Sequence, residues 1–139
     1  MASTKRLDFN KIACAVHPLL LTDKFQACGM KTLNLPASLV ADYQRDGAVV
    51  IRGALDAAEL AVLERGIEAN LAAPGPLAAV ASAADDPGRF FEDFCNWQRI
   101  AEYEQIMRHS ALPSIAAQLT QSQRVRLYHD HLLVKEAGT

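Results

Sequence analysis

The chain has 139 residues, of which half are hydrophobic and 22% are charged, and its formal net charge is -2 at pH 7. This length suits about one ordinary domain, and the composition excludes a disordered tail or a membrane protein. The near-neutral charge also argues against a nucleic-acid scaffold, which is usually strongly basic.

Residues 1–29 differ from the rest of the chain, because they have no clear periodicity. We interpret them as an upstream extension or arm, with an N-terminal helix packed on the core as the alternative, and residues 30–139 as part of one domain. The apolar run at 12–21 is interrupted by His17 and Pro18 and lacks a small-residue cleavage site. Neither a secretory signal nor a membrane-spanning helix is therefore expected.

The three cysteines are Cys14, Cys28 and Cys95, and none of them forms a CxxC pair. This usage indicates reduced thiols in a cytoplasmic protein rather than a zinc knuckle or a redox pair. Because Cys95 lies among aromatic residues, we expect it to be buried and unreactive.

Four helices are predicted in chain order. Residues 37–45 form the first, ended by Gly47, because glycine readily adopts the left-handed conformation found after a helix. The second starts at a capping box of Asp56 and Glu59 and carries an apolar stripe expected to face the core: Leu60, Leu63, Ile67 and Leu71. Two shorter helices are expected at 101–109 and 114–120, the latter with Pro113 in its first turn.

Two strands are predicted. Residues 48–51 are a short β-branched run, and residues 124–135 alternate over a dozen positions. Residues 74–88 are expected to be a surface connection. The aromatic-rich stretch 89–97 is interpreted as core or a pocket wall. The predicted strand at 124–135 has no visible partner, because one long strand and one short strand do not make an independently stable sheet.

The most conspicuous polar cluster surrounds His129 and His131, which share one face of the predicted strand, whereas Asp130 points to the other. Two such histidines could bind a transition metal together with a third ligand, or they could line a polar cavity. Lys135 lies on the same face and could hold a carboxylate, or it could simply be solvated.

Two stretches carry a family resemblance. Residues 46–53, DGAVVIRG, followed by a capped helix, resemble the opening of the phytanoyl-CoA dioxygenase family. Residues 124–138, RVRLYHDHLLVKEAG, are similar to the family strand that precedes the iron motif, and residues 88–97 resemble the stretch before the barrel. The similarity runs over residues 30–139.

This resemblance implies an α+β fold, in which N-terminal helices accompany the first strands of a double-stranded β-helix, the jelly-roll or cupin-like architecture, left incomplete. It also implies Fe(II), 2-oxoglutarate and hydroxylation of a small organic substrate. By the same resemblance, His131 matches a 2-oxoglutarate contact, Lys135 lies near the cavity, and Asn96 aligns near the co-substrate. The family's His-x-Asp iron motif occurs nowhere in the chain.

We therefore expect a truncated oxygenase that is inactive and binds neither iron nor 2-oxoglutarate by itself, with no nucleic-acid or membrane partner. The alternative is a non-catalytic interaction module that pairs its exposed strand with a partner or with itself. A third hypothesis is a minimal metal protein that uses His129 and His131.

Overall fold

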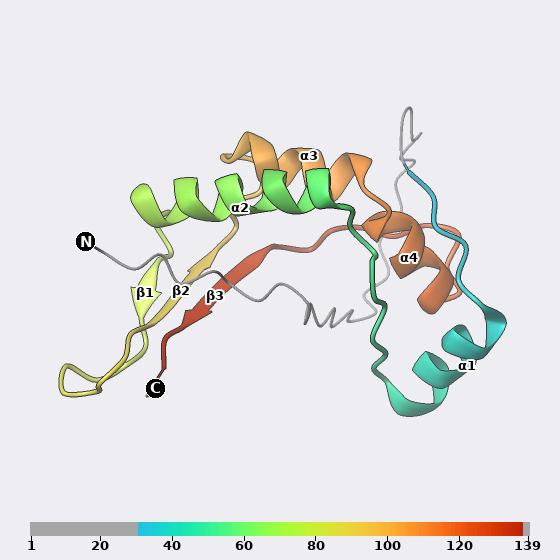
Figure 1. Ribbon diagram of the computed structural model, residues 1–139, viewed down its shortest axis with the longest axis horizontal. Coiled ribbons are helices and arrows are strands. Elements are labelled where there is room, and N and C mark those ends of the chain that lie inside the picture. The colour runs from blue at the N-terminus through green and yellow to red at the C-terminus, as the bar shows by residue number, and fades with distance from the viewer. Residues whose placement is uncertain (1–30, 138–139) are drawn as a thin grey trace.

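The computed structural model describes residues 31–137, which contain four α-helices and one three-stranded antiparallel sheet. The expected mixture of helix and sheet is confirmed at this level (Figure 1). The elements, in order, are α1 (Ala37–Asp46), α2 (Ala57–Ala72), β1 (Ala79–Val80), β2 (Phe90–Phe94), α3 (Ala101–His109), α4 (Leu112–Leu119) and β3 (His131–Lys135).

Strand β2 is the centre of the sheet, which has the order β1-β2-β3. The sequence analysis missed this strand, because two of its five residues are acidic and one of these, Asp93, lies on the buried face. The prediction of a strand over 124–135 is wrong in extent, since only His131–Lys135 pairs with β2. Because β2 has five residues, it can pair with only five residues of the neighbouring strand.

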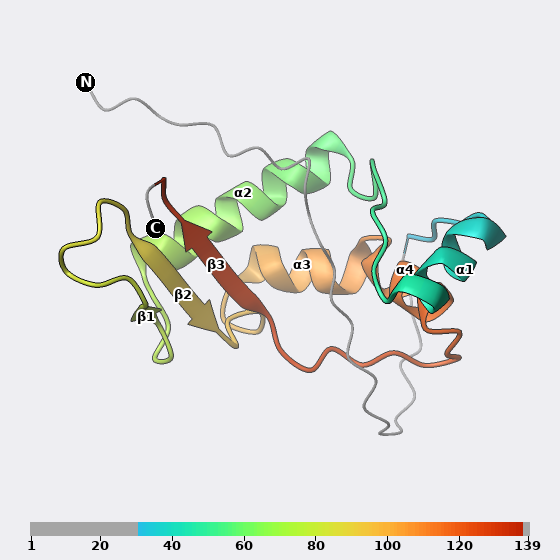
Figure 2. The same cartoon turned by 90° about the horizontal axis from the view of Figure 1, so that it is seen from below.

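Helices α2 and α3 lie side by side over one face of the sheet (Figure 2). Side chains alternate between the two faces of a strand, and Phe91 and Asp93 point toward the helices and are buried. The other face has no helix over it among the described residues, and Leu133 on that face is 53% exposed.

Helix α2 begins as predicted, with the Asp56 carboxylate accepting the Glu59 amide and the Glu59 side chain accepting the Asp56 amide. The predicted apolar stripe is confirmed only in part, since Leu60, Leu63 and Ile67 are half-buried. The buried residues are Val62, Gly66 and Asn70, and Leu71 is exposed. The stripe is displaced because Gly66 permits a close approach of α3: a Cβ there would lie 2.8 Å from the Tyr103 ring.

A hydrophobic core surrounds α4, and its buried residues are Ala111, which directly precedes the helix, Ile115 and Leu119. Residues 33–54 wrap around this helix, and their half-buried apolar side chains include Leu33, Leu35, Val49 and Ile51. The predicted strand at 48–51 is therefore wrong. Val49 and Ile51 alternate inward while Val50 is 62% exposed, but they pack on a helix and pair with no strand among the described residues.

The Gln118 side chain fastens the start of this wrapping segment to α4. Its amide oxygen accepts the Leu35 N–H at 2.9 Å, and its amide nitrogen donates to the Leu33 carbonyl at 2.6 Å. One side chain thus satisfies two backbone groups of an extended segment that has no strand partner in the described part of the chain.

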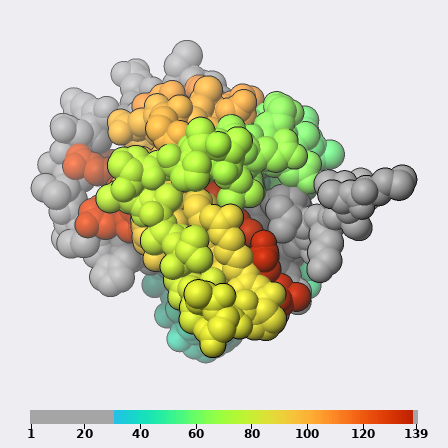
Figure 3. All heavy atoms as spheres, turned by 90° about the vertical axis from the view of Figure 1, so that its left-hand side faces the viewer, coloured from blue at the N-terminus to red at the C-terminus, as the bar shows by residue number. Residues whose placement is uncertain are grey.

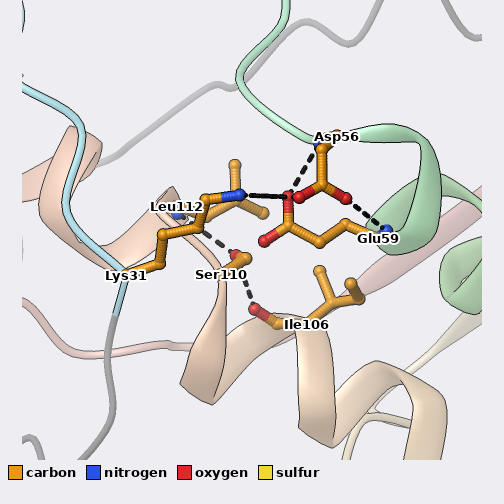
Figure 4. Close-up of polar contacts among 6 residues, drawn as sticks. All are labelled: Lys31, Asp56, Glu59, Ile106, Ser110 and Leu112. Carbon is orange, nitrogen blue, oxygen red and sulfur yellow. Dashed lines mark hydrogen bonds and ion pairs between the residues drawn. The ribbon is translucent and has the colours of Figure 1, made fainter.

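Lys31, the first described residue, contacts two helices (Figure 4). Its ammonium group lies 2.8 Å from Asp56 and 3.3 Å from Glu59 at the start of α2. Its backbone N–H donates to the His109 carbonyl at the end of α3. At the junction to α4, the Ser110 hydroxyl donates to the Ile106 carbonyl and accepts the Leu112 N–H.

The structure also tests the expectations for residues 74–88 and for Cys95. The connection 74–88 is mostly exposed but also contributes β1. The expectation of a buried Cys95 is wrong: it is exposed, with φ of +60°, because the chain turns there from β2 towards α3. Residues 1–29, with Cys14 and Cys28, lie outside the described residues. No helix within 31–137 is long and apolar enough to cross a membrane.

Candidate ligand-binding face

The open face of the sheet carries His131 and Lys135, the two residues that the family resemblance places at or near the co-substrate. In the β2–β3 ladder Phe94 pairs with His131, Glu92 with Leu133, and Phe90 with Lys135. Directly paired residues of an antiparallel ladder share one face. His131 and Lys135 therefore lie with three β2 side chains that sequence reasoning did not connect to them.

His131 is held by two of these neighbours. Its ring stacks on Phe94 with centroids 3.7 Å apart and planes 24° from parallel. Its Nε2 lies 3.6 Å from a Glu92 carboxylate oxygen, a distance that suits an ion pair when the imidazole is protonated. His129 lies further from Phe94, at 6.2 Å between centroids. Phe94 is thus a common neighbour of the two histidines.

Lys135 lies at the other end of the face. Its ammonium nitrogen is 5.9 Å from the centre of the Phe90 ring, a weak cation–π contact. Four residues of strand separate its Cα from that of His131, which corresponds to about 13 Å. Lys135 is therefore available to one carboxylate of a ligand as a point charge, while His131 is already engaged by Glu92.

The described residues do not fit an iron centre. No group of three or more His, Cys, Asp or Glu side chains within 31–137 could hold a metal ion. Asp130, which lies between the two histidines in sequence, is buried, and its carboxylate accepts the Asn96 and Trp97 amides. For 2-oxoglutarate, the cation of Lys135 is a suitable partner on the open face.

A buried polar network on the opposite face was invisible in the sequence. The Asp93 carboxylate accepts the Asn70 side chain at 2.7 Å, the Gly75 amide at 2.7 Å and the Phe94 amide at 2.9 Å. Asn96 is 1% exposed, and its side-chain oxygen accepts the Arg99 guanidinium. Asn96 therefore stabilises the turn into α3 and does not lie on the open face, contrary to the expectation that it approaches a co-substrate.

The ionisation of this network follows from its contacts. Burial raises the pKa of the Asp93 carboxyl, but hydrogen bonds from Gly75, Asn96, Asn70 and Phe94 outweigh it, and the net pKa lies below its ordinary value. Burial, followed by the negative charges of Asp130 and Asp93, raises the pKa of Tyr103 to about 12. The network thus holds Asp93 charged and Tyr103 neutral at pH 7.

No protein-family model, no curated protein and no solved structure matches this chain.

Proposed function

We propose that the chain is the N-terminal part of an Fe(II)/2-oxoglutarate oxygenase of the phytanoyl-CoA dioxygenase type. The observation that best supports the proposal is that His131 and Lys135, two positions singled out by the resemblance, share the open face of an antiparallel sheet. In such an enzyme this face would line the interior of the barrel. The full protein would hydroxylate a small organic substrate.

By this proposal the 139 residues do not turn over alone, because they contain no His-x-Asp motif and the described part has no metal-binding group. Purified chain is incubated with Fe(II), ascorbate and 2-oxoglutarate, and succinate is measured. We expect release equal to that of a blank with metal alone. Release well above the blank would refute the claim of inactivity.

The co-substrate assignment has its own test. In a full-length protein that carries this segment, we expect Lys135→Gln to weaken 2-oxoglutarate binding about two- to fivefold in an NMR titration, since an exposed ion pair contributes about 0.5–1 kcal/mol. Arg52→Gln is the matched control, because Arg52 is exposed and lies outside the sheet. Equal affinities of the two variants, or chemical-shift changes that spare β3, would count against the assignment.

A second candidate is a non-catalytic interaction module, and the position of β3 at the edge of the sheet favours it. An edge strand presents unpaired backbone groups to other chains. Both candidates include a cytoplasmic location, where an exposed thiol such as that of Cys95 stays reduced.

A further inference from the structure

The outer edge of β3 has a defined pattern of backbone groups. Two hydrogen bonds flank its ladder: the Cys95 N–H donates to the Asp130 carbonyl, and the Glu136 N–H donates to the Arg89 carbonyl. Backbone groups in an antiparallel strand point alternately to its two sides. Even-numbered residues from Asp130 to Glu136 therefore bond to β2.

The odd-numbered residues direct their N–H and C=O groups the other way. His131, Leu133 and Lys135 thus present three donors and three acceptors along an edge where no strand lies within the described chain. These are the same residues whose side chains occupy the open face. Figure 3 shows the red atoms of β3 at the surface beside the yellow atoms of β2.

This edge has little of the protection that natural sheets use. Prolines, bulges, lysines and short strand length discourage strand addition. No proline follows Pro113 in the chain, and β3 is five residues long with a lysine only at its end. The middle of the strand carries Leu133, with a side chain that is 53% exposed. Lys135, at the end of the strand, is the single lysine or arginine of β3.

The charges along this edge select the kind of strand that would pair with it. Between 124 and 135 the exposed ionisable side chains other than Tyr128 are all basic or imidazole: Arg124, Arg126, His129, His131 and Lys135. The single acid in that stretch, Asp130, is buried, and its carboxylate is occupied by backbone amides. Directly after the strand, Glu136 is an exposed acid whose carboxylate accepts the Arg89 N–H. Glu92 offsets His131 from the β2 side, so Lys135 is the stronger attraction.

We propose that the outer edge of β3 binds an extended acidic segment of another protein as a fourth strand. Opposite-charge pairs and apolar pairs on neighbouring strands are favourable. The segment would carry acidic residues opposite His131 and Lys135 and an apolar residue opposite Leu133, with an acid-x-apolar-x-acid pattern. Backbone bonds would supply affinity and the charges specificity, as in other strand additions. The inference deepens the second candidate function and is independent of oxygenase chemistry.

The probe is a fluorescein-labelled peptide, SEVLVES, compared with its charge-reversed form SKVLVKS by fluorescence anisotropy. We expect the acidic peptide to bind at least tenfold more tightly. Hydrogen exchange adds a residue-level signature: the peptide should slow exchange of the His131, Leu133 and Lys135 amides. The Leu132 and Val134 amides, which already bond to β2, should change little.

Two variants test the geometry. Leu133→Pro removes one outward N–H and leaves the ladder to β2 intact, so it should weaken binding of the acidic peptide at least tenfold while far-UV circular dichroism is retained. Lys135→Glu keeps the backbone and should reverse the preference toward SKVLVKS, which keeps the proposal testable if the proline variant fails to fold. Arg52→Glu, away from the sheet, is the control and should leave the preference unchanged.

Several results would overturn the proposal. One is equal binding of the two peptides, and another is binding of neither. A third is tighter binding of a single-stranded oligonucleotide than of SEVLVES. The fourth result would come from sedimentation: the chain is a dimer, and Leu133→Pro converts it to a monomer. That result would assign the edge of β3 to a second copy of this chain and not to an acidic partner.

Discussion

Replacing Asp93 by asparagine tests whether the buried polar network stabilises the fold. Both oxygens of the Asp93 carboxylate accept hydrogen bonds: one takes the Asn70 side chain and the Gly75 amide, and the other takes the Phe94 amide. Asparagine retains one acceptor oxygen and places an NH2 group where the second was. At least one donor therefore faces another donor in a fully buried site.

The magnitude follows from these contacts. A hydrogen bond to a charged group contributes about 1.5–3 kcal/mol, and the remaining bonds weaken by roughly half when the acceptor becomes neutral. Removing the buried charge recovers part of its desolvation cost. The lowered pKa of Asp93 means that the hydrogen bonds outweigh that cost in the folded state. We expect Asp93→Asn to lower the free energy of unfolding by about 3 kcal/mol at pH 7.

The pH dependence supplies a second readout. An acid with a lowered folded-state pKa stabilises the protein above its unfolded pKa, which is about 3.9 for Asp. That contribution is lost as pH falls through the folded-state value. The stability gap between the wild-type protein and Asp93→Asn should therefore be widest near neutral pH and should narrow below about pH 4.

Urea unfolding followed by circular dichroism at pH 7 and pH 3 measures both effects. Asp85→Asn is the matched control, since Asp85 is exposed and should change stability by less than about 0.5 kcal/mol. The reasoning is refuted if Asp93→Asn is as mild as Asp85→Asn at pH 7, or if the gap between wild type and variant stays constant down to pH 3.

Three further outcomes are expected. Gly66→Ala should destabilise by about 1–3 kcal/mol in urea unfolding, although alanine favours helix, because its Cβ would lie 2.8 Å from the Tyr103 ring; a gain in stability would contradict this packing. Tyr103, with a pKa of about 12 against about 10 unfolded, should make stability fall as pH rises from 10 toward 12, by about 2–3 kcal/mol. If Tyr103→Phe shows the same pH dependence of stability as the wild-type protein in alkaline urea unfolding, Tyr103 is excluded as the cause. Gln118→Ala should cost about 1–3 kcal/mol by leaving the Leu35 N–H and the Leu33 carbonyl unpaired, whereas Gln98→Ala, at an exposed position, should be near neutral in the same assay.

Local sequence signals predicted the helices well. The capping box of Asp56 and Glu59 and the left-handed Gly47 are interactions among residues a few positions apart, so the sequence carries all that is needed to expect them. Helix α3 has the predicted bounds, 101–109, and α1 differs by one residue. The alternation over residues 131–135 also placed His131 and Lys135 on one face correctly.

Features that depend on distant partners were not predictable in this way. Residues 48–51 have the composition of a strand but wrap around α4, since pairing requires a neighbour that the fold does not bring to them. Strand β2 contains a buried aspartate, which breaks the apolar alternation. The donors that make its burial tolerable include Asn70 and Gly75, which are distant in sequence.

By itself, then, the sequence determined which segments are helical, their bounds to within two residues for α1, α3 and α4, and that His131 and Lys135 share a strand face. Tertiary structure alone decided that β2 is the partner of β3, that Glu92 and Phe94 engage His131, and which edge of β3 is open. The physical reason is that caps and turns are satisfied within a few residues. Strand pairing and the burial of a charge depend instead on groups that meet only when the chain folds.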